Sequence, residues 1–258
     1  MKRDEKRTAI SASVAAIGRD VNTLEELMTK GRYGVLAVGP IESERSRYIE
    51  LRDQLLELGY EEALEVYSKA ITTHDREEAK ALYAEADAMI GHTDMPLWEA
   101  FCAIPIVDKW EDGINNLVTT QGKNDLLDKY LAGSGYTATW YCGLVSSVSF
   151  TAYAAGDTAA QINGSNQWKE AGPTNAPNYS QGNRVAFTFG AAAAGVKATS
   201  SASVFSISQN GTVKGCFAAS TNTKDGTTGV LLSAGNFTGG DKVVQNGDTL
   251  NVSYSLAV

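Results

Sequence analysis

Hydrophobic and polar positions follow two different patterns along this chain, and the change lies near residue 130. Before it, apolar residues mostly recur every three or four positions, as they do on helices. After it, they mostly recur every second position, as they do on strands. The sequence therefore predicts an α+β protein of two domains, covering residues 1–112 and 113–258.

The first domain begins its regular pattern with the apolar run 33–39, which fits a strand covered on both faces. A helix is predicted after it, with Ser43 as a candidate cap and Gly59 as a stop signal. Its apolar residues at helical spacing are Tyr48, Leu51, Leu55 and Leu58. This strand and this helix are the first pair of an alternating pattern.

Further elements of both kinds follow. The capping-box pattern Asp75-Arg-Glu-Glu78 predicts a second helix, and a short third helix is expected at 97–102. Strands are expected at 63–68, 88–91 and 104–107, although a helix fits 63–68 nearly as well. Strands alternating with helices predict a small parallel sheet of the doubly wound kind. The alternative is a mainly helical domain in which only 33–39 is extended.

A helix over 114–132 is predicted to lead into the second domain. Leu117, Val118, Leu126 and Leu127 lie at helical spacing, and Gly133 follows as a stop signal.

The second domain shows alternation of period two from Tyr136 onward, with Trp140, Cys142 and Leu144 on one face. Further strands are expected at 185–189, 202–207, 212–218, 229–233 and 249–256. Tight turns are predicted at Asn163-Gly164, Asn210-Gly211, Asp225-Gly226 and Asn246-Gly247. Short strands joined by such turns indicate an antiparallel β-sandwich or jelly roll.

Charge changes at the same place as the hydrophobic pattern. Residues 1–130 hold 41 of the 52 charged side chains, 16 basic and 25 acidic, whereas residues 131–258 hold 6 basic and 5 acidic ones. An acidic first part repels phosphate backbones, so we expect no nucleic-acid partner. No apolar run is long enough for a membrane span, and no signal peptide is evident, so we expect no membrane partner and assembly in a cytoplasm.

The residues that usually carry chemistry are sparse. Cys102, Cys142 and Cys216 are widely separated and odd in number, which favours buried free thiols over disulfides or a zinc site. The two histidines, His74 and His92, lack the spacing of a metal site. No nucleophile-elbow, phosphate-loop or zinc-protease motif occurs, so we expect no metal, no cofactor and no catalytic residues.

One loose resemblance concerns the first domain. The run Val35-Leu-Ala-Val-Gly-Pro-Ile, with Ala86-Asp-Ala-Met-Ile-Gly and Trp98-Glu-Ala, resembles the nucleoside deoxyribosyltransferase-like fold. That resemblance implies Glu99 as a nucleophile toward a sugar carbon and Asp87 as a supporting carboxylate. Glu42 and Glu44 depart from it, because they would repel a phosphate from the following helix. The alternative is that Asp87 and Glu99 are ordinary surface or capping acids.

A second resemblance covers about residues 115–258. Its segments are Asn116-Leu-Val-Thr-Thr, Leu131-Ala-Gly-Ser, Thr139-Trp-Tyr-Cys-Gly-Leu-Val-Ser-Ser, Glu170-Ala-Gly-Pro-Thr-Asn-Ala-Pro-Asn-Tyr-Ser, Thr223-Lys-Asp-Gly-Thr-Thr-Gly, Phe237-Thr-Gly-Gly-Asp-Lys and Asn246-Gly-Asp-Thr-Leu-Asn-Val. They resemble a family of small virion proteins of tailed bacteriophages, often encoded near head genes. The resemblance implies a particle component and no reaction.

The sequence therefore predicts a non-enzymatic bacteriophage virion protein, most simply a capsid decoration or cement protein bound through its β-domain to the outer face of the head. The expected partners are the major capsid protein or other virion subunits, with homo-oligomers formed on the particle. One alternative is a tail or fibre component that binds the host surface. A second is an enzyme that processes a nucleoside or sugar through residues 33–108.

Overall fold

A computed structural model describes residues 30–73, 75–131, 139–163 and 168–257. Its α-helices are α2 (Arg45–Glu57), α3 (Glu61–Thr72), α4 (Arg76–Met89), α5 (Met95–Cys102) and α6 (Thr120–Leu131), and the short 3₁₀ helices are η2 (Glu42–Glu44) and η3 (Ala159–Gln161). Its strands are β1 (Lys30–Pro40), β2 (Ile106–Val118), β3 (Tyr141–Ser146), β4 (Lys169–Glu170), β5 (Val185–Ala186), β6 (Thr188–Phe189), β7 (Val196–Ser201), β8 (Ser203–Ser206), β9 (Gly211–Ala219), β10 (Leu231–Asn236), β11 (Lys242–Val244) and β12 (Thr249–Ala257).

The strands form one large curled sheet of 12 strands, in which every pairing between named strands is antiparallel. β1 lies between β2 and β12, so the first described strand pairs with the last one along its length. β2 also pairs with β10, which connects this part of the sheet to β9 and β3. The protein is thus a mixed α+β fold with a mostly β region.

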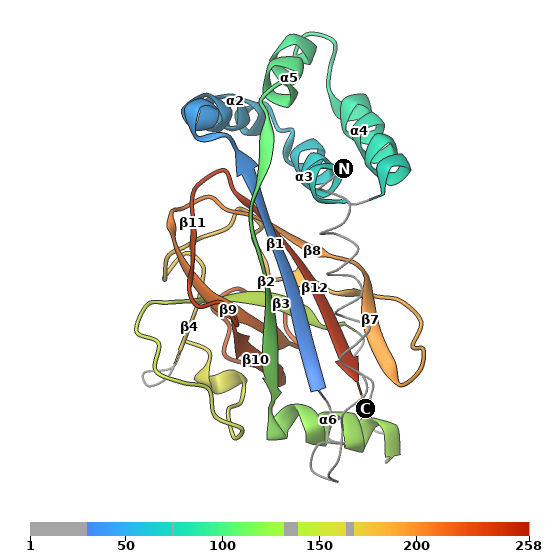
Figure 1. Cartoon of the computed structure of the whole chain (residues 1–258), viewed down its shortest axis with the longest axis vertical. Coiled ribbons are helices and arrows are strands. Elements are labelled where there is room, and N and C mark those ends of the chain that lie inside the picture. Colours follow the sequence, from blue (N-terminus) through green and yellow to red (C-terminus); the bar gives the residue numbers. More distant parts are fainter. Residues whose placement is uncertain (1–29, 74, 132–138, 164–167, 258) are drawn as a thin grey trace.

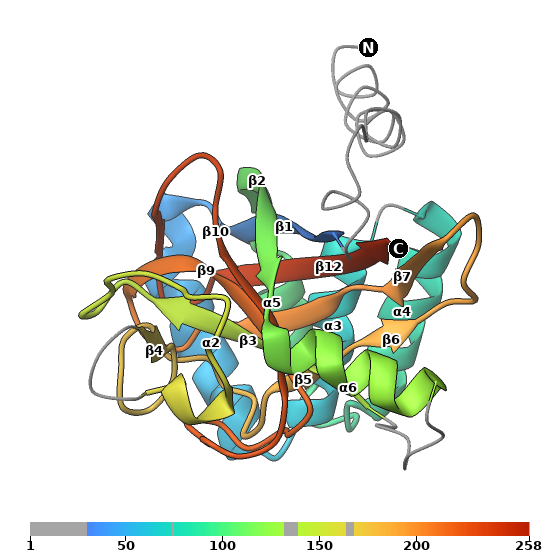
Figure 2. The same cartoon turned by 90° about the horizontal axis from the view of Figure 1, so that it is seen from below.

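The curl of the sheet encloses its main hydrophobic core (Figure 2). Tyr33 and Tyr254 enter this core from β1 and β12, and Cys142 and Cys216 enter it from β3 and β9. A smaller cluster, which includes Val145, Trp168 and Phe217, packs against the opposite face of β3 and β9. Because both of its faces are covered, β3 is buried from Cys142 to Ser146.

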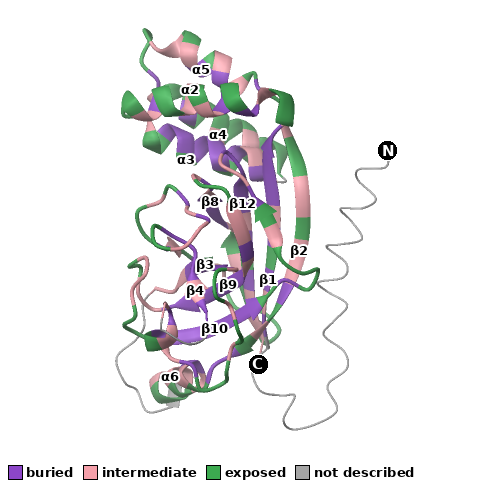
Figure 3. Ribbon diagram, turned by 90° about the vertical axis from the view of Figure 1, so that its left-hand side faces the viewer, coloured by how far each residue is buried: buried purple, intermediate pink, exposed green. Residues whose placement is uncertain are grey.

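The helices α2 to α5 lie between β1 and β2 in the sequence and occupy one end of the sheet, while α6 lies at the other end (Figure 1). The helices α2 to α5 share a hydrophobic cluster of their own, in which the largest side chains are those of Tyr48, Tyr67, Trp98 and Phe101. Figure 3 shows that buried residues lie on the inner strands and on α3, whereas β2 is half-buried or exposed along much of its length.

The predicted parallel sheet is wrong. The strand at 33–39 is present as β1, but its neighbours β2 and β12 are antiparallel to it. Residues 63–68 belong to α3, and 88–89 end α4. The physical reason is that short apolar runs do not reveal their partners, and the spacing of 63–68 fits a helix nearly as well as a strand. Between β1 and β2 the mainly helical alternative describes the chain.

The predicted helix boundaries hold in part. Gly59 follows α2 with a positive φ of 87°, as expected of a stop residue, but no side chain caps the start of α2, so Ser43 is not its cap. Asp75 does cap α4, since its carboxylate accepts hydrogen bonds from the backbone N–H groups of Glu77 and Glu78.

The segment at 114–132 is divided between two elements. β2 continues to Val118, and α6 begins at Thr120. Leu117 is 40% exposed whereas Val118 is buried, which is the alternation of a strand. Thr119 ends the strand by donating its N–H to the Leu232 carbonyl and accepts a hydrogen bond from the Gly122 N–H. The expected domain boundary at 112/113 falls inside β2.

The strands expected at 185–189, 202–207, 212–218 and 249–256 correspond to β5 with β6, β8, β9 and β12. The strand expected at 229–233 begins later, as β10 at Leu231. The alternation expected from Tyr136 becomes β3 at Tyr141, and residues 136–138, Gly133 and Gly164 lie outside the described residues.

Candidate functional site

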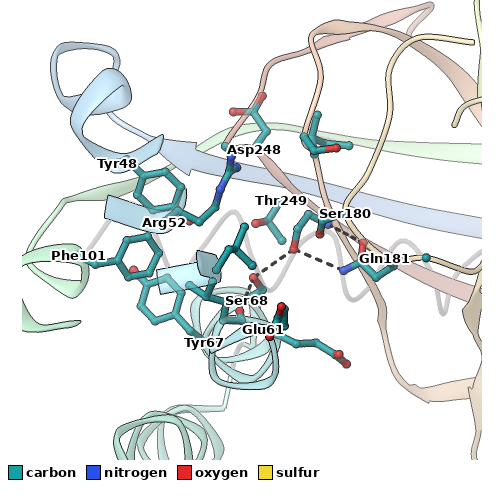
Figure 4. Close-up of a pocket in the computed structure, with 18 residues that line it drawn as sticks. Tyr48, Arg52, Glu61, Tyr67, Ser68, Phe101, Ser180, Gln181, Asp248 and Thr249 are labelled. Atoms are coloured by element: carbon teal, nitrogen blue, oxygen red, sulfur yellow. Dashed lines mark hydrogen bonds between the residues drawn. The ribbon is translucent and has the colours of Figure 1, made fainter. Parts of the chain in front are cut away.

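A cleft of about 540 Å³ lies where the helices meet the end of the sheet. On one side are the rings of Tyr48, Tyr67 and Phe101, and on the other are Ser180, Gln181 and Thr249 (Figure 4). The cleft therefore joins three helices to the loop before Arg184, to the end of β8 and to the start of β12.

The aromatic side of the cleft is fixed by ring contacts. The Phe101 ring centroid lies 4.8 Å from that of Tyr48 and 5.0 Å from that of Tyr67. Tyr48 is 4% exposed and Tyr67 is 2% exposed. Burial raises the pKa of both phenols, so each keeps its proton at neutral pH.

The polar side of the cleft is held by the backbone of β8. The N–H of Ser206 donates to Gln181 Oε1 at 3.2 Å, and its carbonyl accepts from the Ser180 N–H at 2.9 Å. Ser68 on α3 lies 3.4 Å from the Ser206 hydroxyl, so the helix and strand sides meet through hydroxyl groups (Figure 4).

At the wall of the cleft, Asp248 joins the helices to the sheet. Its buried carboxylate accepts from Arg45 Nη1 at 3.0 Å, forms an ion pair with Lys109 Nζ at 2.8 Å and accepts from the Gln245 N–H at 2.9 Å. Arg45 Nη1 also donates to the Asn246 carbonyl. Through these contacts Asp248 ties α2, β2 and the start of β12 together.

Arg52 adds a second link from α2. Its Nη1 donates to Asn246 Oδ1 at 2.9 Å, and its Nε and Nη2 bind Asp53. Gly247, between Asn246 and Asp248, has φ 91° and packs against the Tyr48 ring, which would lie 3.3 Å from an added Cβ. The predicted turn at Asn246-Gly247 is therefore present, and it holds the helices.

The two carboxylates that the deoxyribosyltransferase resemblance singled out lie on different helices, Asp87 on α4 and Glu99 on α5. Asp87 accepts a hydrogen bond of 2.6 Å from the indole N–H of Trp98, which is a structural contact between α4 and α5. Glu99 is exposed on α5, and neither residue lines the cleft. The alternative reading of both as surface acids agrees with these positions.

The other candidate reactive groups are dispersed. Cys142 and Cys216 are buried free thiols as predicted, and Cys102 is a half-buried one. Burial, with a smaller effect of Asp87, raises the pKa of Cys102 to about 12. His92 is exposed, and His74 lies outside the described residues. Within the described ranges no cluster of His, Cys, Asp and Glu could hold a metal ion.

A buried ion pair lies within the β region. Arg184 donates from Nε and Nη2 to the two carboxylate oxygens of Glu170, at 2.9 and 2.8 Å, and both side chains are fully buried. Burial raises the pKa of Glu170, and Arg184 opposes this rise. Arg184 also donates to the carbonyls of Thr221 and Gly226.

Two loops meet around this pair. The Asp225 N–H donates to Glu170 Oε2, and the Asp225 carboxylate accepts from Asn163 Nδ2 and from the Thr174 hydroxyl. Lys224 donates to the Tyr179 carbonyl and lies 3.7 Å from the centroid of the Tyr179 ring. These contacts form one polar network in space. It joins two segments of the virion-protein resemblance, those that begin at Glu170 and Thr223.

Asp112 of β2 binds a third segment of the virion-protein resemblance, the one that begins at Phe237. Its carboxylate accepts from the Thr238 hydroxyl, the Gly239 N–H and Lys242 Nζ, each at 2.7–2.9 Å. These donors, with the Gly113 N–H, lower the pKa of Asp112 although its burial acts in the opposite direction. The loop from Phe237 to Lys242 is therefore fixed against β2.

The outer face of β2, β1, β12 and β7 carries a shallow groove of about 580 Å³. Gly34 is opposite both Gly113 and Ser253 in the strand register, so the floor of the groove has almost no side chains. No other part of the described chain covers Gly34 or Ser253, which are exposed. Charged side chains along it are Arg32, Glu111 and Asp112.

Sequence reasoning did not identify the cleft, the Asp248 cluster or the outer groove. Tyr48 was recognised as a residue of the buried helix face, and Asn246-Gly247 as a turn. The signal that could have linked them is the rarity of charge after residue 131, where Asp248, Glu170 and Arg184 are three of 11 charged residues, and all three are buried. Charged side chains are almost never fully buried unless they are paired, so the few charges of a β region are candidates for buried pairs.

The sequence matches no protein-family model and no curated protein. None of the described helices is long and apolar enough to cross a membrane.

Proposed function

We propose that this chain is a structural protein of a tailed-bacteriophage virion that decorates the head shell, and that it binds the shell through the outer face of β2, β1, β12 and β7. The observation that carries the proposal is the open groove floored by Gly34, Gly113 and Ser253. A floor without bulky side chains lets a partner's backbone approach closely, and the few charges along it need little desolvation.

The hairpin formed by β6 and β7 extends this face. Residues 191–198 are all exposed, and the connection between the strands projects from the body of the protein (Figure 2). It includes the small-residue run Ala191–Ala194, for which the sequence suggested no role. An exposed arm of mostly small residues, with Lys197 as its one charged side chain, is suited to lie against a neighbouring subunit.

Two finer features of the fold belong to this proposal. We infer that the curled sheet acts as a β-sandwich of jelly-roll type, because side chains of β1 and β12 meet those of β3 and β9 in one core. We also infer a two-domain organisation, in which the helices α2 to α5 are a separate unit with their own cluster. The division would then follow the helices and leave β1 and β2 in the β unit.

The acidic helices would face away from the shell. The four helices α2 to α5 carry many exposed carboxylates, including Glu57, Glu62, Glu77 and Glu85, at the end of the sheet away from α6. The major capsid protein is the proposed partner, and further copies of the chain would bind by symmetry. Many repeated contacts of low affinity give a stable layer without a single strong contact.

Cosedimentation with shells tests the proposal. Purified chain is mixed with heads that lack it, and the bound fraction is measured for the wild type, for Ser253→Trp and for Glu62→Gln. Ser253→Trp should abolish binding because the indole fills the groove, and Glu62→Gln on α3 should bind as the wild type does. Equal binding of the Ser253→Trp variant, with its fold verified by circular dichroism, would overturn the proposed face.

A further inference from the structure

The cleft between the helices and the sheet has features of a ligand site that are separate from the outer face. It is lined from α2, α3 and α5 on one side and from the ends of strands on the other. Its volume of about 540 Å³ is within the range of small-molecule sites, which usually lie at such junctions.

Two phenol hydroxyls border this cleft. Tyr48 and Tyr67 line it and are at least nine-tenths buried as residues. Neither phenol oxygen makes a hydrogen bond within the described part of the chain, and neither is among the buried polar atoms there that lack a partner, so both hydroxyls are accessible from the cleft. Because burial raises the pKa of both groups, each stays protonated and can donate and accept.

The cations of the cleft are already paired, and its other charges are carboxylates. Asp248 is paired with Arg45 and Lys109, and Arg52 is held by Asp53 and Asn246. Glu65 is paired with Lys69, and the exposed Glu61 adds a further carboxylate to the lining. The lining thus offers no uncommitted guanidinium or ammonium group to a phosphate or sulfate. The remaining polar atoms are mainly hydroxyls, such as those of Ser180, Ser208 and Thr249.

The aromatic side supplies a rigid apolar surface beside these hydroxyls. The Phe101 ring contacts the rings of both Tyr48 and Tyr67. The Tyr67 ring also contacts that of Trp98, with 5.7 Å between the two ring centroids. A surface fixed in this way loses little conformational freedom when a ligand binds. A ligand with an apolar face and several hydroxyls on its edge fits both sides.

We propose that this cleft binds a neutral carbohydrate, one or two sugar rings in size, through the phenol hydroxyls of Tyr48 and Tyr67 and the hydroxyls of the strand side. The proposal does not depend on the location of the protein in a particle. If both proposals hold, the chain gives the particle surface a carbohydrate-binding function in addition to its structural one.

The experiment uses the full chain labelled with ¹⁵N and titrated with glucose, galactose, N-acetylglucosamine, maltose and lactose while amide chemical shifts are recorded. At least one sugar should bind with a Kd of about 1 mM or tighter and shift amides of Ser180, Gln181 and Ser206. Tyr67→Phe removes only the hydroxyl and should raise the Kd about tenfold. Tyr141→Phe, at a half-buried tyrosine of β3 outside the cleft, should leave the Kd unchanged.

Three results would overturn the carbohydrate site. The first is no shift with any of the five sugars at about 20 mM, where a ligand of 1 mM Kd is almost saturating. The second is binding that Tyr67→Phe and Ser180→Ala both leave unchanged. The third is tighter binding of inorganic phosphate than of any of the five sugars in the cleft. Such binding would require a cationic side chain that is free to contact the phosphate. None of these results bears on shell binding, which is measured by cosedimentation.

Discussion

Arg184 and Glu170 form a two-pronged ion pair in the interior of the β region, with N–O distances of 2.9 and 2.8 Å and no exposed side-chain surface. Glu170 belongs to β4, and Arg184 directly precedes β5. The loops that begin at Glu170 and Thr223 are therefore anchored by one buried contact. This contact joins in space two of the segments on which the virion-protein resemblance rests.

Breaking this pair from one side should strongly destabilise the protein. Glu170→Gln leaves a buried guanidinium without its counter-ion, so the free energy of unfolding should fall by about 3–5 kcal/mol. The measurement is urea denaturation followed by tryptophan fluorescence. Glu170→Gln combined with Arg184→Met should lose much less than the sum of the two single changes, because the double variant contains no unpaired charge.

The matched control for that pair lies at the surface, between η2 and α2. Arg47 of α2 and Glu44 of η2 are 3.6 Å apart, with side chains 60% and 36% exposed, so Glu44→Gln should change the free energy of unfolding by about 0–1 kcal/mol. A loss from Glu170→Gln as small as that from Glu44→Gln would contradict the buried anchor.

Asp112 should make the stability of the protein depend on acid pH. Its folded-state pKa is lowered by Lys242, Thr238 and two backbone N–H groups, so its contribution is present above the unfolded pKa of about 3.9. It is lost as the pH falls through the lower folded value. Asp112→Asn should therefore cost about 1–3 kcal/mol at pH 7, and the difference from wild type should shrink progressively below about pH 4.

Denaturation curves for wild type and Asp112→Asn at a series of pH values from 7 downward give this difference directly. Asp128→Asn, at an exposed position of α6, provides the control and should follow the wild type throughout. A stability difference for Asp112→Asn that stays constant down to the lowest pH would mean that the carboxylate's charge does not hold the loop at Phe237–Lys242.

Two glycines of the sheet should respond oppositely to the same change. A Cβ at Gly215 would overlap the Gly235 carbonyl oxygen, so Gly215→Ala forces β9 and β10 apart and should cost about 3 kcal/mol or more. A Cβ at Gly34 meets no atom within 4 Å, so Gly34→Ala should gain about 0.5–1 kcal/mol from reduced backbone entropy of the unfolded chain. Thermal unfolding of the two variants compares them; equal effects would contradict the packing of β9 against β10.

Thiol labelling should distinguish the cysteines. Cys142 and Cys216 are buried in the core, and Cys102 is half-buried with a pKa raised to about 12 by burial and Asp87. A disulfide reagent at pH 8 should thus react slowly with Cys102 and not at all with the other two in the folded protein. Three thiols should react at once after unfolding, and Cys102→Ser should remove the slow reaction. Rapid modification of native Cys142 would contradict the buried core.

Local pattern predicted the elements better than their partners. The capped helix at Asp75 and the strands that became β8, β9 and β12 follow from residue spacing and turn chemistry, both of which act over a few residues. The pairing of Tyr33 with Tyr254 across β1 and β12 joins positions more than 200 residues apart, and no periodicity encodes it. The interpretation of 33–39 as part of a parallel sheet failed for that reason.

The candidate site was less accessible from sequence than the fold. Asp248 and Arg45 look like an ordinary turn residue and an ordinary helix residue, and their ion pair exists only because the helices pack against the start of β12. Conversely, Asp87 and Glu99 looked significant through a loose resemblance, but Asp87 binds an indole N–H and Glu99 lies exposed on α5.

Cryo-electron microscopy of the particle made by the genome that encodes this chain would locate the chain on the particle. We expect density for the chain repeated over the icosahedral lattice of the head, with β2, β1, β12 and β7 against the shell and the helices α2 to α5 outward. Density confined to the tail would support a host-binding fibre component and contradict decoration. A particle without the chain would contradict a virion role altogether.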